Sequence, residues 1–212
     1  MYTVKEIFHT LQGEGFHTGR SAVFCRFTGC NLWTGREADR HRAICQFCDT
    51  DFVGVGPDGG RFATAAELAE RVASLWPPGN EASAPFVVCT GGEPLLQLDE
   101  SLIQAFHAQG FEVAVETNGT QPVPAGLDWV CVSPKAGAPL HLLNGDELKL
   151  VYPQVEDEAQ PHQFEHLAFA HFFLQPMDGP FLSENTRRAV EFCVAHPKWR
   201  LSLQTHKMLG LR

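Results

Sequence analysis

Three of the seven cysteines lie close enough in the sequence to act together. Cys30 precedes Cys45 by an insert of fourteen residues, and Cys45 and Cys48 form a Cys-x2-Cys pair. Closely placed thiolates bind soft metals. Structural zinc usually takes four ligands, and His41 in the intervening loop is a candidate for the fourth. Iron–sulfur clusters are normally held by four cysteines, so three would leave one iron open to an exogenous molecule. The spacing alone leaves zinc, an open cluster and coincidence as alternatives.

A glycine-rich turn, Thr90-Gly91-Gly92-Glu93-Pro94, follows a predicted strand. Adjacent glycines let the backbone approach a ligand closely, and carbonyl and carboxylate oxygens accept hydrogen bonds from an ammonium group. By itself, such a segment is equally typical of a simple turn. A second glycine-rich segment, residues 53–61, lacks the Lys-Ser/Thr ending of a phosphate-binding loop and is predicted to be a flexible connection.

Polar side chains occur at or near the carboxyl ends of six predicted strands. They are Arg26, Thr90, Glu116, Ser133, Gln175 and His206. Barrel enzymes form their active sites at this end. Polar residues also occur where a chain merely leaves the core, but six of them favour a site. Because side chains alternate along a strand, Cys25 and Cys89 are predicted on the opposite face as buried filler against helices, and helical Cys193 is interpreted in the same way.

The elements that must position these residues alternate between strand and helix patterns, as is typical of βα units. Strands are predicted over 22–27, 86–90, 112–116, 129–133, 147–152, 171–175 and 200–205, and helices over 64–76, 99–109 and 183–196. Thr64 and Glu67 form a capping-box pattern, and Gly110 is a typical helix end. About a dozen residues separate the strand ending at Ser133 from each neighbour, near the minimum for a helical crossover. Those helices are therefore reduced to a turn, or one strand is misplaced.

Composition limits the class of protein. The 212 residues are 44% hydrophobic and 19% charged, which predicts one globular domain over residues 1–212. A full eight-fold barrel needs about 250 residues, so only a trimmed, partly open barrel fits. The net charge of −9 disfavours a nucleic-acid partner. No apolar run reaches the ~20 residues of a membrane span, no secretory signal is visible, and the odd cysteine count argues against a disulfide framework. We therefore expect a cytoplasmic protein.

The cysteines and the Gly-Gly-Glu-Pro turn together resemble the radical S-adenosylmethionine (SAM) superfamily. In that superfamily three cysteines hold a [4Fe–4S] cluster, whose fourth iron chelates the amino and carboxylate groups of SAM, and a Gly-Gly-Glu-Pro-like motif holds the methionine amino group. The usual spacing is Cys-x3-Cys-x2-Cys with an aromatic residue before the last cysteine. Phe47 matches that aromatic residue, whereas fourteen residues stand here in place of the usual three.

This longer spacing and several further motifs resemble the 7-carboxy-7-deazaguanine synthase family within that superfamily. The motifs are Leu11-Gln12-Gly13-Glu14-Gly15, Cys48-Asp49-Thr50, Glu116-Thr117-Asn118-Gly119, Ser133-Pro134-Lys135, Gln175-Pro176-Met177-Asp178 and Gln204-Thr205-His206-Lys207. They span nearly the whole chain. The resemblance implies a single radical SAM domain with a shortened, partly open (β/α)6 barrel, which agrees with the tight crossovers.

The resemblance also implies a carbon–nitrogen lyase of queuosine precursor biosynthesis. Its reaction would be ring contraction of 6-carboxy-5,6,7,8-tetrahydropterin to 7-carboxy-7-deazaguanine with loss of ammonia, and SAM would be regenerated. Implied cofactors are a [4Fe–4S] cluster, SAM and Mg²⁺, and implied partners are a reducing electron donor such as flavodoxin and a second copy in a homodimer. Two alternatives stay open: a glycyl-radical activating enzyme and a non-catalytic zinc or iron–sulfur module.

Residue roles follow from the resemblance. The cluster ligands would be Cys30, Cys45 and Cys48. The expected SAM-binding residues are Phe47, Gly91, Gly92, Glu93, Ser133, Pro134, Lys135, Gln175, Pro176, Met177 and Asp178. The expected substrate-binding residues are Leu11, Gln12, Gly13, Arg26, Thr90, Glu116, His206 and Arg212. No catalytic side chain is assigned, because SAM would carry the radical. Lys135 has an alternative interpretation as a surface charge, and His206 as a terminal polar residue.

Two predictions concern the mouth of the barrel. Thr50 is expected to give its hydroxyl to Mg²⁺, which prefers oxygen ligands; Asp49 is a rival ligand, and Thr50 as a simple loop cap is the alternative. The segment from His206 to Arg212 is expected to close over the substrate. His206 would extend from the last strand, the apolar side chains of Met208, Leu209 and Leu211 would be buried, and the terminal carboxylate of Arg212, rather than its guanidinium, would reach the pterin.

Overall fold

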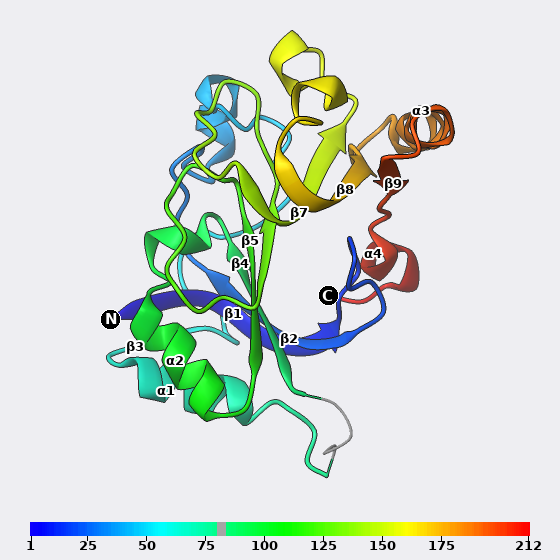
Figure 1. Ribbon diagram of the computed structural model, residues 1–212. Coiled ribbons are helices and arrows are strands. Elements are labelled where there is room, and N and C mark those ends of the chain that lie inside the picture. Colours follow the sequence, from blue (N-terminus) through cyan, green and yellow to red (C-terminus); the bar gives the residue numbers. More distant parts are fainter. Residues whose placement is uncertain (80–83) are drawn as a thin grey trace.

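The computed structural model of the chain describes residues 1–79 and 84–212 and contains a nine-stranded sheet (Figure 1). The strand order is β3-β1-β2-β4-β5-β6-β7-β8-β9. The strands are β1 (Tyr2–Leu11), β2 (Ser21–Phe27), β3 (Gly60–Phe62), β4 (Phe86–Gly91), β5 (Glu112–Thr117), β6 (Trp129–Val132), β7 (Asn144–Tyr152), β8 (Ala168–Pro176) and β9 (Trp199–Leu201). Neighbours from β2 to β9 are parallel, whereas β1 is antiparallel to both β2 and β3.

Four α-helices accompany the sheet. They are α1 (Ala65–Ala73), α2 (Glu100–Ala108), α3 (Leu182–Ala195) and α4 (Thr205–Leu209). Short 3-10 helices are η1 (Glu37–Arg42), η2 (Pro94–Leu96), η3 (Asp157–Ala159) and η4 (Pro161–Gln163). The start of α1 follows the predicted signal, since the Thr64 hydroxyl accepts a hydrogen bond from the Glu67 amide. Glu67 reaches back to the Ala63 amide rather than to Thr64 itself. Gly110, at φ +82°, follows α2 as expected.

The outer face of the sheet is packed by helices at two places. Beneath α1 and α2, fully buried Cys25 and Cys89 lie in one apolar cluster with Leu68 and Ile103. The prediction that these two cysteines are core filler is confirmed. Near α3, a second cluster joins β7, β8 and β9, and Cys193 packs partly buried against it. Each large apolar side chain buried in this way contributes about 1.5–3 kcal/mol, so the outer face holds the strands while their inner face remains available for a site.

Several sequence predictions need correction. The strands β1 and β3 were not predicted, although β3 falls at the end of the glycine-rich segment 53–61. The last predicted strand, 200–205, is wrong beyond Leu201, because the chain turns there and Thr205–Leu209 forms α4, which ends at Gly210 with φ +67°. The two tight connections around β6 contain no α-helix among the described residues, as their length required.

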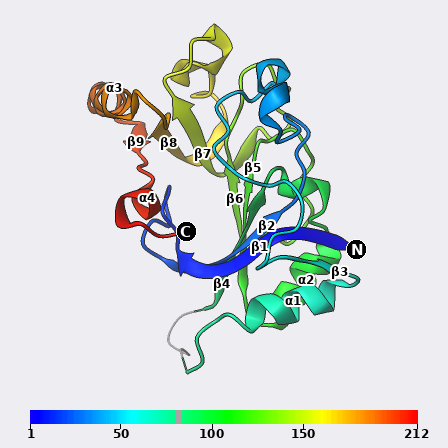
Figure 2. The same ribbon diagram turned by 180° about the vertical axis from the view of Figure 1, so that it is seen from behind.

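The sheet is open, because its edge strands β3 and β9 do not pair with each other. The prediction of a partly open α/β fold with a parallel sheet is confirmed. Seven consecutive strands, from β2 to β9, run parallel, and only some of the crossovers between them contain α-helices in the described residues. Figure 2 shows α4 beside the loop after β1, across the gap, and the Thr205 amide there donates to the Gly13 carbonyl at 2.9 Å. Within the described ranges, no helix combines the length and apolar character of a membrane span.

Candidate active site

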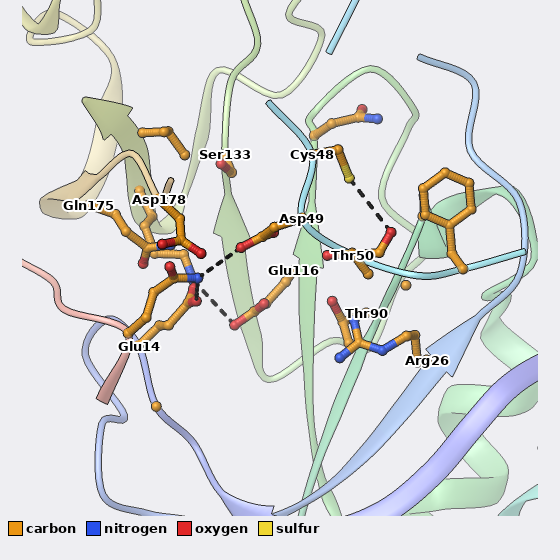
Figure 3. A pocket seen from close by; sticks show the side chains of 18 of the residues that line it. Glu14, Arg26, Cys48, Asp49, Thr50, Thr90, Glu116, Ser133, Gln175 and Asp178 are labelled. Atoms are coloured by element: carbon orange, nitrogen blue, oxygen red, sulfur yellow. Dashed lines mark hydrogen bonds and ion pairs between the residues drawn. The ribbon is translucent and has the colours of Figure 1, made fainter. Parts of the chain in front are cut away.

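A pocket of about 410 Å³ opens at the carboxyl ends of the parallel strands (Figure 3). Its walls come from the inner face of the sheet, the cysteine loop after β2, and the C-terminal segment. The predicted site residues that line it are Leu11, Gln12, Gly13, Arg26, Cys30, Cys45, Phe47, Cys48, Thr50, Thr90, Gly91, Gly92, Glu116, Ser133, Lys135, Gln175, Pro176, Met177, Asp178, His206 and Arg212. The fold therefore gathers residues from position 11 to position 212 around one cavity.

Glu93 and Pro134 are the predicted site residues that the structure does not bring into the pocket wall. Glu93 is fully buried, and its carboxylate accepts hydrogen bonds from the Thr117 hydroxyl at 2.7 Å, the Asn118 amide at 2.8 Å and the Leu95 amide at 3.0 Å. Burial raises the pKa of Glu93, and these donors oppose that rise. The side chain thus ties the end of β4 to the end of β5 from behind the wall.

Gly91 and Gly92 let two backbone segments meet beside the cysteines. Gly91 has φ +140°, and a Cβ added there would lie 2.2 Å from the Phe27 carbonyl oxygen. A Cβ on Gly92 would lie 2.1 Å from the Gly29 carbonyl oxygen and 2.9 Å from the Cys30 Cβ. Because no side chain fits, the turn after β4 packs directly against the cysteine loop and exposes its backbone to the pocket.

The three predicted cluster ligands occupy one wall of the pocket. Hydrogen bonding with Cys45 lowers the pKa of Cys48 to about 6. Burial raises the pKa of Cys30. Within residues 1–79 and 84–212, no three His, Cys, Asp or Glu side chains gather around a single ion position. Three cysteine sulfurs on one wall are soft donors of the kind that hold an iron–sulfur cluster, and no fourth ligand for a tetrahedral zinc gathers with them in the described part of the chain.

The wall beyond the cysteines carries amide, hydroxyl and ammonium groups. The Lys135 ammonium donates to the Ser133 hydroxyl at 2.6 Å and to the Ser133 carbonyl at 2.5 Å. This places Lys135 against the pocket wall rather than free on the surface. Gln175 is buried and accepts a hydrogen bond from the Ser202 hydroxyl at 3.2 Å. These groups are held in place before any ligand arrives.

The floor of the pocket is a buried ion-pair cluster. The Lys149 ammonium from β7 lies 2.6 Å from a Glu14 carboxylate oxygen and 3.4 Å from a Glu116 carboxylate oxygen of β5. The Gln12 amide donates to the same Glu116 oxygen at 3.0 Å, and the Gln204 amide donates to Glu14 at 2.9 Å. We call Glu14, Glu116 and Lys149 the floor cluster; Figure 3 shows its two labelled carboxylates among the pocket side chains.

Charge and burial oppose each other in the floor cluster. Burial would raise the pKa of Glu14, but Lys149 and the Gln204 amide outweigh it and lower the pKa to about 2. Burial would lower the pKa of Lys149, but Glu116 and Glu14 hold it well above its usual value. Glu14 and Lys149 are therefore both charged at neutral pH.

Charged pairs also border the mouth. The Arg26 Nε donates to Glu6 at 2.8 Å, and the other Glu6 oxygen accepts from Arg212 at 2.9 Å. Arg212 also pairs with Asp58 at 2.8 Å. The guanidinium of Arg212 is thus engaged by two carboxylates of the protein.

The helix α4 joins three loops at the mouth. The Lys207 ammonium lies 2.5 Å from Asp49 and 2.6 Å from Asp178, which lowers the pKa of Asp178. His206 reaches the pocket from α4, and its ring lies so close to Gly13 that a Cβ on Gly13 would be 2.2 Å from the His206 Nδ1. Glycine at position 13 therefore allows the loop after β1 to contact α4. We call Lys207, Asp49 and Asp178 the rim cluster.

Two curated proteins of one name are similar to this chain over its whole length. A curated protein from Bordetella pertussis named 7-carboxy-7-deazaguanine synthase is 63% identical over 211 residues, covering 99% of each chain. One of the same name from Bradyrhizobium diazoefficiens is 63% identical over 212 residues, covering all of this chain and 99% of its own. The chain belongs to the 7-carboxy-7-deazaguanine synthase family.

A solved structure agrees with this assignment. The crystal structure of QueE from Escherichia coli matches with a TM-score of 0.67 at 28% identity, covering 95% of this chain and 93% of that one. No protein-family model matches the chain. Membership of the 7-carboxy-7-deazaguanine synthase family identifies the protein as an enzyme and rejects the alternatives of a non-catalytic metal module and a glycyl-radical activating enzyme.

Sequence analysis missed part of this family member's pocket. Lys149 in β7 and Cys131 in β6 both line the pocket. A strand pattern alone does not distinguish them from other residues inside a strand. Glu14 belongs to the motif of residues 11–15, but the sequence pattern assigns it no role of its own. The signal that could have found Lys149 is its charge within the apolar run Leu148–Val151, since a buried lysine needs a partner.

The predicted burial of the tail is wrong. Met208 is 73% exposed, Leu209 66% and Leu211 39%. The reason is that α4 turns His206 and Lys207 toward the pocket, which leaves its apolar side chains facing outward. The tail is held by the Thr205–Gly13 hydrogen bond and by ion pairs rather than by apolar burial.

Proposed function

We propose that this pocket converts 6-carboxy-5,6,7,8-tetrahydropterin to 7-carboxy-7-deazaguanine with loss of ammonia, a step toward queuosine. The observation that carries the proposal is one cavity bordered by three cysteine thiols on one wall and by carboxylates on its floor. It is supported by the 63% identity to proteins named for that product. The step breaks a carbon–nitrogen bond without net oxidation, because the substrate minus ammonia has the composition of the product.

Cys30, Cys45 and Cys48 would hold a [4Fe–4S] cluster, and the backbone of Gly91 and Gly92 would face SAM. When bound, the cluster and SAM supply the abstraction and return of one hydrogen atom. The remaining SAM contacts would come from Phe47, Glu93, Ser133, Pro134, Lys135, Gln175, Pro176, Met177 and Asp178. The chain itself would bind and orient SAM and the substrate and would exclude water from the pocket.

Each end of the pocket suits a different part of the pterin. Within the described residues, Arg26 uses only its Nε for Glu6, which leaves its two Nη groups for the substrate carboxylate. The carboxyl oxygens of Glu116 on the floor would accept hydrogen bonds from ring N–H donors. The backbone of 11–13, with Thr90 and His206, would border the ring, and the terminal carboxylate of Arg212 would accept from it as well. The donor-rich ring would then lie between the carboxyl groups of the floor and the guanidinium of Arg26.

The test of this function is anaerobic incubation of the reconstituted protein with SAM, a reductant and the carboxypterin. We expect 7-carboxy-7-deazaguanine and ammonia in equal amounts. Cys45→Ala should lose the cluster iron and all turnover. Cys25→Ala and Cys193→Ala should keep both, because those thiols lie on the helix-covered face. Normal iron content and turnover in Cys45→Ala would contradict the proposal.

Thr50 is proposed to bind Mg²⁺ together with the substrate carboxylate. It lines the pocket, and its rival Asp49 is already paired with Lys207. Chelation should reduce turnover, and Mg²⁺ should restore it in the wild type but only weakly in Thr50→Ala. Asp49→Asn is the matched control and should recover as the wild type does. Turnover that is indifferent to Mg²⁺ would refute the assignment.

Further parts of the proposal concern context. We infer one radical SAM domain over residues 1–212, of the shortened (β/α)6 type, acting as a homodimer in the cytoplasm. A reducing protein such as flavodoxin would deliver the electron. Sedimentation of the purified protein tests the homodimer. Reduction of the protein by purified flavodoxin tests the electron donor.

A further inference from the structure

The insert between Cys30 and Cys45 carries an arginine that returns to the cysteine loop. Arg40, in η1, donates through its Nη1 to the Gln46 carbonyl at 2.8 Å and to the Cys48 carbonyl at 3.0 Å. These two carbonyls flank Phe47, the residue that separates them within the Cys-x2-Cys segment. One guanidinium nitrogen therefore fixes the backbone from which Cys45 and Cys48 extend.

The guanidinium of Arg40 is itself held on its other sides. Its Nε and Nη2 donate to the Glu37 carboxylate at 2.7 and 2.5 Å. Its carbon lies 4.0 Å from the centre of the Trp33 ring, within cation–π distance. Trp33 is buried and packs edge-on against Phe52 at 5.7 Å. The insert thus forms a bracket, anchored in the core by Trp33, that presents one oriented cation to the cysteine loop.

We propose that Arg40 is a positioning residue that sets the retention and the reduction potential of the cluster held by Cys30, Cys45 and Cys48; this rests on the proposed function. Groups that orient metal ligands tune both properties. A fixed positive charge favours the more negative, reduced state of a cluster, and hydrogen bonding and local charge set its potential. The fourteen-residue insert would then hold, through Arg40, the backbone that carries two of the cluster ligands.

The chain offers a matched control on the same element. Arg42 is exposed, and its Nε contacts only the neighbouring His41 ring, at 3.1 Å, among the described residues. Arg42→Met removes the same charge from η1 without touching a cysteine-loop carbonyl. Glu37→Gln removes a negative charge instead of a positive one, from a side chain that is 75% exposed. It is expected to keep both hydrogen bonds from Arg40 to the cysteine-loop carbonyls.

The experiment compares anaerobically reconstituted wild type, Arg40→Met, Arg40→Lys, Glu37→Gln and Arg42→Met. The readouts are iron per chain, the electron paramagnetic resonance spectrum of the reduced cluster, its midpoint potential, and the rate of iron loss to a chelator. In Arg40→Met we expect a more negative potential and iron loss about tenfold faster. Arg40→Lys should recover much of the potential but not the slow loss, because one ammonium does not reproduce the fixed fork. Glu37→Gln should shift the potential the other way.

Arg42→Met should match the wild type in all readouts. Arg40→Met and Glu37→Gln with wild-type potentials and iron retention would overturn the inference. Equal effects of Arg40→Met and Arg42→Met would also overturn it, since surface charge alone would then explain them. Circular dichroism of the protein without iron shows whether Arg40→Met folds. If it does not, the midpoint potentials and iron-loss rates of Glu37→Gln and Arg40→Lys test the inference in its place. A wild type that holds no four-iron cluster would instead reject the proposed function.

Discussion

The floor cluster and the rim cluster have the same composition, one lysine between two carboxylates, but differ in their contact with water. In the floor cluster the side chains of Lys149 and Glu14 are 6% and 14% exposed. In the rim cluster the side chains of Lys207 and Asp49 are 38% and 42% exposed. The shortest distances are nearly equal, 2.6 Å and 2.5 Å. Opposite charges at the same distance attract more strongly where water is excluded. The attraction is therefore expected to be stronger in the buried floor cluster than in the rim cluster.

This difference in burial changes what each cluster costs to form and to break. Ions that leave water lose hydration, and the floor cluster compensates through mutual attraction and the amides of Gln12 and Gln204. Its carboxylates are thereby fixed before a ligand binds. The rim cluster is more exposed and keeps more of its hydration, so breaking it is expected to cost less.

The largest effect is expected from Lys149→Met. This change leaves Glu14 and Glu116 without their cation in a buried site, and breaking a buried pair by removing one partner costs about 3–5 kcal/mol. Urea unfolding of the protein without iron measures the loss directly. Carboxypterin binding should weaken as well, because the floor carboxylates would protonate or move.

Lys207→Met is the matched control for that change. It removes the same side chain from between two carboxylates, but exposed pairs contribute only about 0–1 kcal/mol. Equal losses of stability in the two variants would show that burial does not distinguish the clusters.

Acid should affect the floor cluster more than the rim cluster. The pKa of Glu14 falls from an ordinary 4.5 to about 2 in the folded protein. Its contribution is therefore complete above about pH 4.5 and is lost as the pH falls toward 2, and it amounts to about 3 kcal/mol. Urea unfolding between pH 6 and 2.5 tests this. In Glu14→Gln the decline over that range should be shallower; an unchanged decline would mean that Glu14 is not responsible.

The smallest effect on stability is expected from deleting residues 208–212. The deletion removes the exposed side chains of Met208 and Leu209 and the pairs of Arg212 with Glu6 and Asp58. Stability should change by less than about 1 kcal/mol, whereas carboxypterin binding should weaken, since the terminal carboxylate moves. Cluster assembly and uncoupled SAM cleavage should remain. Full turnover by the truncated protein would show that the tail has no part in the site.

Local patterns were sufficient for much of the fold. Apolar runs predicted the strands from β4 to β8, and Thr64 and Gly110 predicted where α1 begins and α2 ends. The failures lie where local signal is weak. The strand β3 has three residues at a sheet edge, and the segment after Leu201 alternates like a strand but becomes α4. Short edge elements are fixed by their neighbours rather than by their own propensity.

The sequence by itself determined the thiol loop, the glycine turn and the polar strand ends, because spacing and residue type decide which chemistry is possible, and alternation along a strand decides which side chains share a face. Only the tertiary structure decided that Glu93 stands behind the wall, that Lys149 joins Glu14 and Glu116 across 135 and 33 residues of sequence, and that Arg40 returns to the cysteine loop. The physical reason is that burial and long-range pairing set the strength of a charge, and neither is written in any local segment.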